Sequence, residues 1–256
     1  MLLAIDIGNT TIVVGLFKET ILKDRFSLST RHGMTADEAG FVITGWLERM
    51  SLSAEDVEVV IISSVVPPLT TTFEITSKRH LGCLPIIVSH KLKLPITIEI
   101  DQPDQVGADR IANAVAGFTK FGGPVIVVDF GTATNFDIVD NKAAYVGGIL
   151  LPGPETSMAE LAKRAARLFE VRIEPPDFVV GKSTAGALKS GLFYGTIGQV
   201  DYLIDKVLEE TGFKGCTIVG TGGFSRGIDK YSKHIKTIEP NLTLEGLRLI
   251  AGLNAK

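Results

Sequence analysis

The sequence predicts a mixed α/β protein that contains the same structural unit twice. Two stretches carry this prediction, "LLAIDIGNTTIVVGLF" at 2–17 and "PVIVVDFGTATNFDIV" at 124–139. Each reads as an apolar strand that runs into an aspartate, a short turn with glycine, and a second apolar strand. A shift of 123 residues aligns three pairs: Asp6 with Asp129, Gly8 with Gly131, and Thr11 with Thr134.

Local patterns predict the elements of the first repeat in order. Apolar runs predict strands over 2–6, 11–17 and 21–30, the first two joined by a Gly8-Asn9-Thr10 turn. Thr35, with Glu38 three residues later, indicates a capping box at the start of an amphipathic helix. The elements that follow are this helix over 35–50, a strand buried on both faces at 58–66 and ended by Pro67-Pro68, a helix over 70–79, a strand at 85–88 and a helix over 107–121.

The second repeat begins after "FGGP" at 121–124, which marks the predicted domain boundary. We therefore expect one domain over 1–121 and another over 122–256. Its predicted elements are the second acidic hairpin, extended by 137–139 and 143–146, a helix over 156–169 with a capping box from Ser157 to Glu160, a long helix over 184–210, a strand, glycine-rich turn and helix start over 215–228, and a helix over 242–253.

Composition limits the classes of function. The chain is 45% hydrophobic and 21% charged, as in an ordinary globular protein, and its net charge of −3 and pI of about 5.9 favour no nucleic-acid partner. Cys83 and Cys216 lack a partner motif, so we expect free thiols. The apolar N-terminus has no basic region, and no apolar run approaches the ~20 residues of a membrane span. These features predict a cytoplasmic protein without a membrane partner.

The repeated turns predict a nucleotide site. Backbone N–H groups and threonine hydroxyls in such turns can donate to phosphate oxygens, and glycine lets the backbone approach closely. Asp6 and Asp129 can hold the water shell of Mg²⁺ or a monovalent cation. The strand and glycines of "TIVGTGGFSRGI" at 217–228 can pass against a nucleoside. A single hairpin of this kind is more often an ordinary turn, but its repetition predicts two halves of one clamp around the phosphates.

Seven motifs extend over nearly the whole chain in one order: "DIGNT" (6–10), "SSVVP" (63–67), "GADR" (107–110), "DFGTATN" (129–135), "GGILLPG" (147–153), "GKST" (181–184) and "GTGG" (220–223). In this the chain resembles the type III pantothenate kinases, within the superfamily of actin, the sugar and acetate kinases and the heat-shock chaperone ATPases. The resemblance implies two duplicated ribonuclease-H-like domains, the actin-like ATPase fold, with a nucleotide cleft between them. It also implies ATP-dependent phosphorylation of pantothenate to 4′-phosphopantothenate, the first step of coenzyme A biosynthesis.

The resemblance assigns roles that the residues alone leave open. Asp109 would take the proton of the attacking hydroxyl, although an acid in the first turn of a helix is more often a partner of the helix dipole. Arg110 suits a carboxylate, but it also suits an ordinary salt bridge. Thr184 would contact the substrate, or it would cap the following helix. The predicted substrate-binding residues are Gly107, Ala108, Asp109, Arg110 and Thr184.

The nucleotide and its ions are assigned in the same way. The predicted ATP-binding residues are Asp6, Ile7, Gly8, Asn9, Thr10, Thr11, Ile12, Val13, Thr132, Gly222 and Gly223. Asp129 resembles the family's ligand for a monovalent cation, K⁺ or NH4⁺, and Asp6 would hold Mg²⁺ through water. The expected cofactors are therefore ATP, Mg²⁺ and a monovalent cation, and the resemblance further implies a homodimer.

One position departs from the family pattern. Ile100 stands where the family often has a tyrosine that touches the substrate, so Tyr145 or Tyr194 would have to fill that role. Two other functions stay open at this stage. One is a transcriptional accessory protein that binds without phosphoryl transfer, as some proteins of this fold are described, and the other is a kinase for a different small alcohol or sugar.

Overall fold

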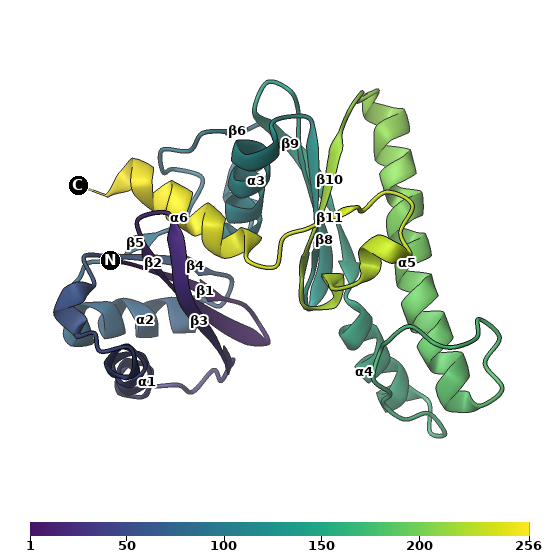
Figure 1. The fold of residues 1–256 in the computed structure, drawn as a ribbon, viewed down its shortest axis with the longest axis horizontal. Helices are drawn as coiled ribbons and strands as arrows, with labels where there is room; N and C mark the ends of the chain where they lie inside the picture. The colour runs from purple at the N-terminus through teal and green to yellow at the C-terminus, as the bar shows by residue number, and fades with distance from the viewer. Residues whose placement is uncertain (256) are drawn as a thin grey trace. The chain divides into compact units, whose positions relative to one another are not determined.

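The computed structural model describes residues 1–255, which fold into two compact units. The first unit contains residues 1–120 together with the segment that begins at Leu242, and the second contains residues 121–241. Figure 1 shows the elements of both units, and each unit is described by itself below.

The first unit is built on a sheet with the strand order β3-β2-β1-β4-β5. Its strands are β1 (Leu2–Ile7), β2 (Thr11–Lys18), β3 (Ile21–Ser29), β4 (Val59–Ser64) and β5 (Ile86–Ile87). The first three strands are antiparallel neighbours, and β4 adds in parallel to β1. Because β4 is flanked by β1 and β5, its residues Val60 to Ser63 are fully buried, which confirms the predicted doubly buried strand.

Helices cover both faces of this sheet (Figure 1). One apolar cluster joins Leu3, Ile5 and Ile7 of β1 to α1 (Ala36–Arg49) and α2 (Pro67–His80). The predicted capping box at Thr35 and Glu38 is present at the start of α1. The opposite face carries α6 (Leu242–Asn254), which packs against β1 and β4. The remaining elements of the unit are the short helical turns η1 (Ala54–Asp56) and η2 (Pro103–Gln105), the strand β6 (Thr97–Ile98) and the helix α3 (Ala108–Phe121).

The second unit repeats the first in topology. Its strands are β7 (Val125–Phe130), β8 (Ala133–Val139), β9 (Ala144–Pro152), β10 (Thr217–Gly222) and β11 (Thr237–Ile238). Within the unit they follow the order β9-β8-β7-β10-β11, again an antiparallel meander with a parallel strand added to the first strand. The five strands of each unit have the same order and the same directions, so the predicted duplication is confirmed.

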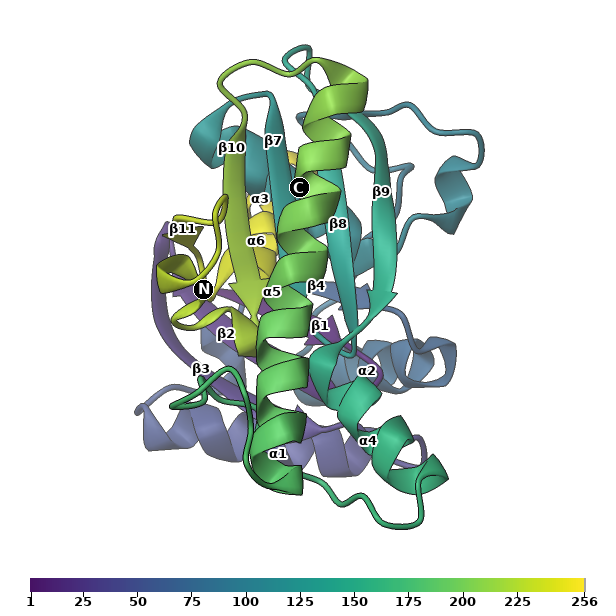
Figure 2. The same cartoon turned by 90° about the vertical axis from the view of Figure 1, so that its right-hand side faces the viewer.

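A long helix covers one face of the second sheet (Figure 2). Phe193, Ile197 and Val200 of α5 (Thr184–Thr211) pack in one apolar cluster with Ile126 and Val128 of β7. The other helical elements of this unit are α4 (Pro154–Arg164) and the short turns η3 (Gly223–Ser225) and η4 (Ile228–Lys230). None of the described helices is long and apolar enough to cross a membrane.

Several predicted boundaries were wrong for local reasons. Pro67 does not only end a strand: it starts α2, because proline is well accommodated in the first turn of a helix. Likewise α4 begins at Pro154 after Gly153, so Ser157 lies inside the helix instead of capping it. The helix ends at Arg164, and residues 165–183 form no regular element. After β10 the chain makes short turns where a longer helix start was expected.

The last helix belongs to the first unit, although the expected boundary placed it in the second domain. The backbone at Gly246 of α6 lies so close to α3 that an added Cβ would be 2.0 Å from the carbonyl oxygen of Ala112. Beside it, Thr243 Oγ1 donates to Asn113 Oδ1 over 2.8 Å. A single boundary in the sequence cannot describe this arrangement, because α6 at the end of the chain packs with the first unit.

This close approach predicts the effect of adding one methyl group. Gly246→Ala should lower the free energy of unfolding by about 1–3 kcal/mol, because the rigid backbone of α3 cannot move aside. Gly252→Ala is the matched control in the same helix, since nothing lies within 4 Å of its added Cβ. It should stabilise the protein by about 0.5–1 kcal/mol through helix propensity. Urea unfolding measures both, and equal effects would contradict the observed packing of α6.

Candidate active site

The first acidic turn lies between β1 and β2 and is closed by three hydrogen bonds. Gly8 N donates to Thr11 O across the turn (3.0 Å). Thr30, which directly follows β3, donates from its backbone N to Thr10 O (2.9 Å) and from Oγ1 to Gly8 O (2.7 Å). Asn9, Thr10 and Thr11, three of the residues that the sequence predicts to bind ATP, are exposed on this turn.

Two of the predicted ATP-binding residues offer only their backbone. Ile7 and Ile12 are fully buried and belong to the apolar cluster of the first unit. Their side chains therefore cannot touch a ligand, because strand residues alternate between the two faces of the sheet. Val13 lies on the other face, where it is the register partner of Asp6.

Asp6 lies between Val13 of β2 and Ser63 of β4 in the register of the sheet. Ser63 is completely buried, and its Oγ has no hydrogen-bond partner within the protein. Buried hydroxyls without a partner are uncommon because desolvation costs free energy. The position beside Asp6 is thus polar, where a strand with only a structural role would be apolar. No role was predicted for Ser63 from the sequence.

The second acidic turn is one residue shorter than the first. Gly131 N donates to Ala133 O (3.0 Å), and Asp129 pairs with Asn135 where Asp6 pairs with Val13. The alignment of Thr11 with Thr134 was therefore wrong. Thr134 is 1% exposed and occupies the register position of buried Ile12, whereas Thr132 is the exposed threonine of this turn.

The glycine-rich turn after β10 lies directly beside the second acidic turn. Gly222 is the register neighbour of Phe130, and its φ of 85° is in the left-handed region. An added Cβ there would be 2.5 Å from Asp129 Oδ1. The structure thus brings together Asp129, Thr132, Gly222 and Gly223 of the predicted site at one edge of the second sheet. Ser225 Oγ donates to Gly222 O (2.7 Å) and fixes this turn.

Asp109 lies in the first turn of α3, as predicted. Its Oδ1 accepts a hydrogen bond from Arg110 N (2.9 Å), and an added Cβ at Gly107 would be 2.4 Å from the same oxygen. Burial raises the pKa of the Asp109 carboxyl above its ordinary value, although the Arg110 N–H and guanidinium oppose the shift. Burial is therefore the larger influence on the pKa of this carboxyl. A general base gains from a pKa that lies closer to the working pH.

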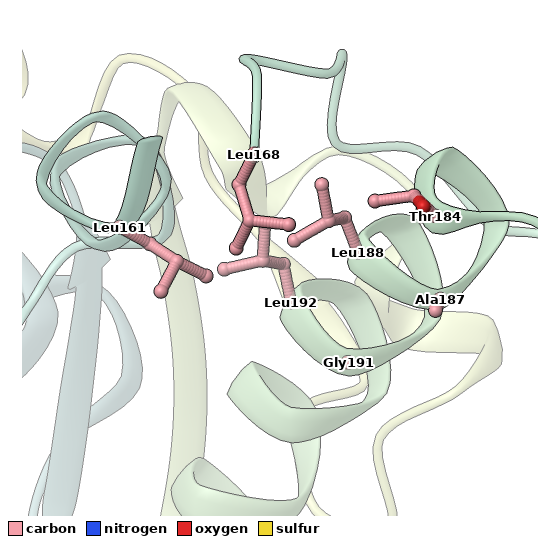
Figure 3. A pocket seen from close by; sticks show the side chains of 7 residues that line it. All are labelled: Leu161, Leu168, Thr184, Ala187, Leu188, Gly191 and Leu192. Carbon is pink, nitrogen blue, oxygen red and sulfur yellow. The ribbon is translucent and has the colours of Figure 1, made fainter. Parts of the chain in front are cut away.

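Thr184 is the first residue of α5 and lies at one end of an apolar pocket of about 340 Å³ (Figure 3). It is not the cap of this helix, because Ser183 Oγ accepts from Gly186 N (3.1 Å) in that role. The pocket is lined by Leu161, Leu168, Thr184, Ala187, Leu188, Gly191 and Leu192. The exposed hydroxyl of Thr184 is thus available to a ligand that places an apolar part beside it.

Neither tyrosine takes an obvious substrate role. Tyr145 is 1% exposed, and its hydroxyl donates to the buried carboxylate of Asp137 (3.0 Å). Tyr194 packs edge-on against the ring of Phe193, which also lies on α5, and against the ring of Tyr231, which follows η4. Among the residues that the structure describes, no three His, Cys, Asp or Glu side chains gather as a metal site.

Comparison with known proteins agrees with the motifs. A family model described as type III pantothenate kinase matches residues 2–206. The chain is 42% identical to the type III pantothenate kinase of Exiguobacterium sp. (strain AT1b) over the whole of both chains. The chain belongs to the type III pantothenate kinase family. It is also 43% identical to the type III pantothenate kinase of Finegoldia magna, over 99% of this chain and 98% of that relative.

Solved structures confirm the actin-like fold of this pantothenate kinase family member. A Campylobacter jejuni protein named as a Baf family transcriptional activator aligns with a TM-score of 0.60 over 98% of this chain and 97% of its own, at 23% identity. The activator of 2-hydroxyisocaproyl-CoA dehydratase from Clostridium difficile, solved with bound ADPNP, aligns with a TM-score of 0.53 over 97% and 92% at 12% identity. At such low sequence identities, these alignments show the fold alone.

The raised pKa of Asp109 predicts how this kinase family member changes stability with pH. A carboxyl whose folded pKa is raised favours folding below its unfolded pKa of about 4, and this contribution is lost as pH rises through the folded pKa. Asp109→Asn keeps the acceptor for Arg110 N but carries no charge, so it should be more stable than the parent at pH 8. The difference should shrink toward pH 5.

Urea unfolding of both proteins across this pH range measures the difference. Asp104→Asn is the matched control. Asp104 lies three residues before Gly107 and is exposed, so this substitution should change the free energy of unfolding little at either pH. A variant Asp109→Asn that is less stable than the parent at pH 8 would contradict the assignment of a destabilising buried charge.

Proposed function

We propose that this protein transfers the γ-phosphate of ATP to the primary hydroxyl of pantothenate, yielding 4′-phosphopantothenate for coenzyme A biosynthesis. Family membership supports the reaction. The structural observation that carries the proposal is the acidic turn built twice, each time with an exposed threonine and a glycine whose N–H donates across the turn. Two such turns provide amide and hydroxyl donors for phosphate oxygens without a dedicated phosphate-binding loop.

The residues assigned to the nucleotide lie in the two acidic turns and in the glycine-rich turn after β10. Asn9, Thr10 and Thr11 of the first turn and Thr132 of the second offer exposed donors for phosphates. Gly222 and Gly223 offer backbone without side chains for the nucleoside. Asp6 would hold Mg²⁺ through water, and Asp129 would hold a monovalent cation; these ions would neutralise charge that develops on the phosphates. Carboxylates and hydroxyls are the oxygen donors that such hard cations prefer.

Asp109 would accept the proton of the attacking hydroxyl. Its carboxylate accepts from Arg110 N and lies against Gly107, which has no side chain in its way, so it takes a defined position at the start of α3. Arg110 would bind the substrate carboxylate, and Thr184 would contact the same substrate. Since phosphoryl transfer passes through a loose transition state, positioning and charge neutralisation should contribute more than the strength of the base.

The homodimer and the cytoplasmic location stay predictions. The apolar pocket beside Thr184 and the exposed Phe178, Val179 and Val180 of the segment before α5 are compatible with a surface covered by a second copy. Sedimentation velocity on the purified protein tests the dimer directly.

The deciding experiment is ADP release with ATP, Mg²⁺ and pantothenate, measured once in K⁺ and once with Na⁺ as the sole monovalent cation. Pantothenate-dependent turnover that rises with K⁺ supports both the reaction and the cation at Asp129. Turnover with another small alcohol but not with pantothenate would favour a different kinase. Absence of turnover in a folded protein that binds a DNA duplex at moderate salt would favour the transcriptional accessory protein.

Substitution of Asp109 tests the assigned base. Both Asp109→Asn and Asp109→Ala should lower kcat by about 10²–10⁴-fold, the usual contribution of a general base. Asp109→Ala should lose more, because Asn keeps the hydrogen bond from Arg110 N and the shape of the side chain. Steady-state rates at saturating ATP and pantothenate measure the loss, and near-normal turnover in either variant would remove Asp109 from the mechanism.

A further inference from the structure

Each acidic turn is held by a hydroxyl that the motifs do not include. In the first unit this is Thr30, whose Oγ1 donates to Gly8 O (2.7 Å) while its backbone N donates to Thr10 O (2.9 Å). Thr30, which follows β3, thus forms hydrogen bonds to two carbonyl groups of the turn, those of Gly8 and Thr10. Thr30 is half-buried, so these bonds are partly shielded from water.

The second turn has an equivalent hold that is built from different residues. Gly153 directly follows β9 as Thr30 directly follows β3, and its N donates to Thr132 O (3.0 Å) as Thr30 N donates to Thr10 O. Gly153 has no hydroxyl and no room for one, since an added Cβ would be 2.2 Å from Gly131 O. The hydroxyl comes instead from Thr156 in the first turn of α4, where Oγ1 donates to Thr132 O over 2.6 Å.

These bonds fix the direction of the turn amides. A trans peptide group is planar, so its C=O and the following N–H point in opposite directions. Holding the carbonyls of Gly8 and Thr10 therefore sets the direction of the N–H groups of Asn9 and Thr11. Holding the carbonyl of Thr132 does the same for Ala133 N–H. Amides aimed in advance bind phosphate more strongly because less ordering remains to be done on binding.

We propose that Thr30 and Thr156 are positioning residues for nucleotide phosphates, each acting through the turn that its hydroxyl holds. The inference rests on the proposed use of ATP. Thr156 is not needed to start α4, because Gly153 caps that helix without any side-chain bond. Its hydroxyl donates outside its own helix, to the one carbonyl of the turn that Gly153 N already holds.

The test compares the isosteric loss of each hydroxyl with its conservative replacement. Thr30→Val and Thr156→Val remove the donor, and Thr30→Ser and Thr156→Ser keep it. Thr72→Val is the control, because Thr72 Oγ1 also donates to a backbone carbonyl, that of Pro68, but within α2. A fluorescent ATP analogue measures the dissociation constant of each variant, and steady-state rates give separate KM values for ATP and pantothenate.

Each valine variant should weaken nucleotide binding about five-fold, the factor that one neutral hydrogen bond is commonly worth. The serine variants should bind within about two-fold of the parent. KM for ATP should rise with the dissociation constant, whereas KM for pantothenate and the affinity of Thr72→Val should stay at the parent values. If the two hydroxyls contributed only to stability, the valine variants would not raise KM for ATP alone, and the serine variants would not restore nucleotide binding.

Failure of this inference and failure of the proposed function give different results. If the parent binds the analogue and the folded valine variants bind it equally well, the positioning role is overturned. If the variants behave as expected but pantothenate is not phosphorylated, the proposed substrate is wrong and the positioning role stands. A parent protein that binds no nucleotide would overturn both.

Discussion

The rest of the structure depends on one constraint: each sheet has a central strand that is paired on both sides and covered on both faces. Such a strand is expected to be apolar along most of its length, and β1 and β7 are apolar at every position except the second-to-last. A charged side chain is easiest to accommodate near the end of such a strand. Asp6 and Asp129 occupy that place, so the same burial that builds each core also determines where each carboxylate lies.

The turns of the second unit depend on glycines, whose lack of a side chain permits close contacts between backbone segments. At Gly222 the backbone adopts a positive φ and approaches Asp129, and at Gly153 the end of β9 approaches the neighbouring turn so closely that no Cβ fits. These glycines permit contacts between backbones that would otherwise be held apart by side chains. They explain why the motifs are rich in glycine where the chain makes turns, and why the turns can be short and still closed by hydrogen bonds.

Sequence alone predicted the strands, the duplication and the position of Asp109, because periodicity and repetition are local signals. It failed where partners are distant along the chain. The return of α6 to the first unit depends on Gly246 meeting Ala112, and the one-residue difference between the turns appears only in the register of Asp129 with Asn135. Thr30 could have been found by extending the repeat to the end of the third strand, but Thr156 could not, since its hydroxyl substitutes for a residue at another position.

The environment of Asp109 combines opposing influences on its charge that would suit the general base proposed for it. Burial disfavours its charge and raises its pKa, while the Arg110 N–H and guanidinium favour the charge and oppose that shift. A strongly stabilised carboxylate would be easier to fold around but would accept a proton less readily. If Asp109 is the base, the free energy lost by burying its carboxylate would follow from that role, and the buried apolar cores of both units would offset the loss.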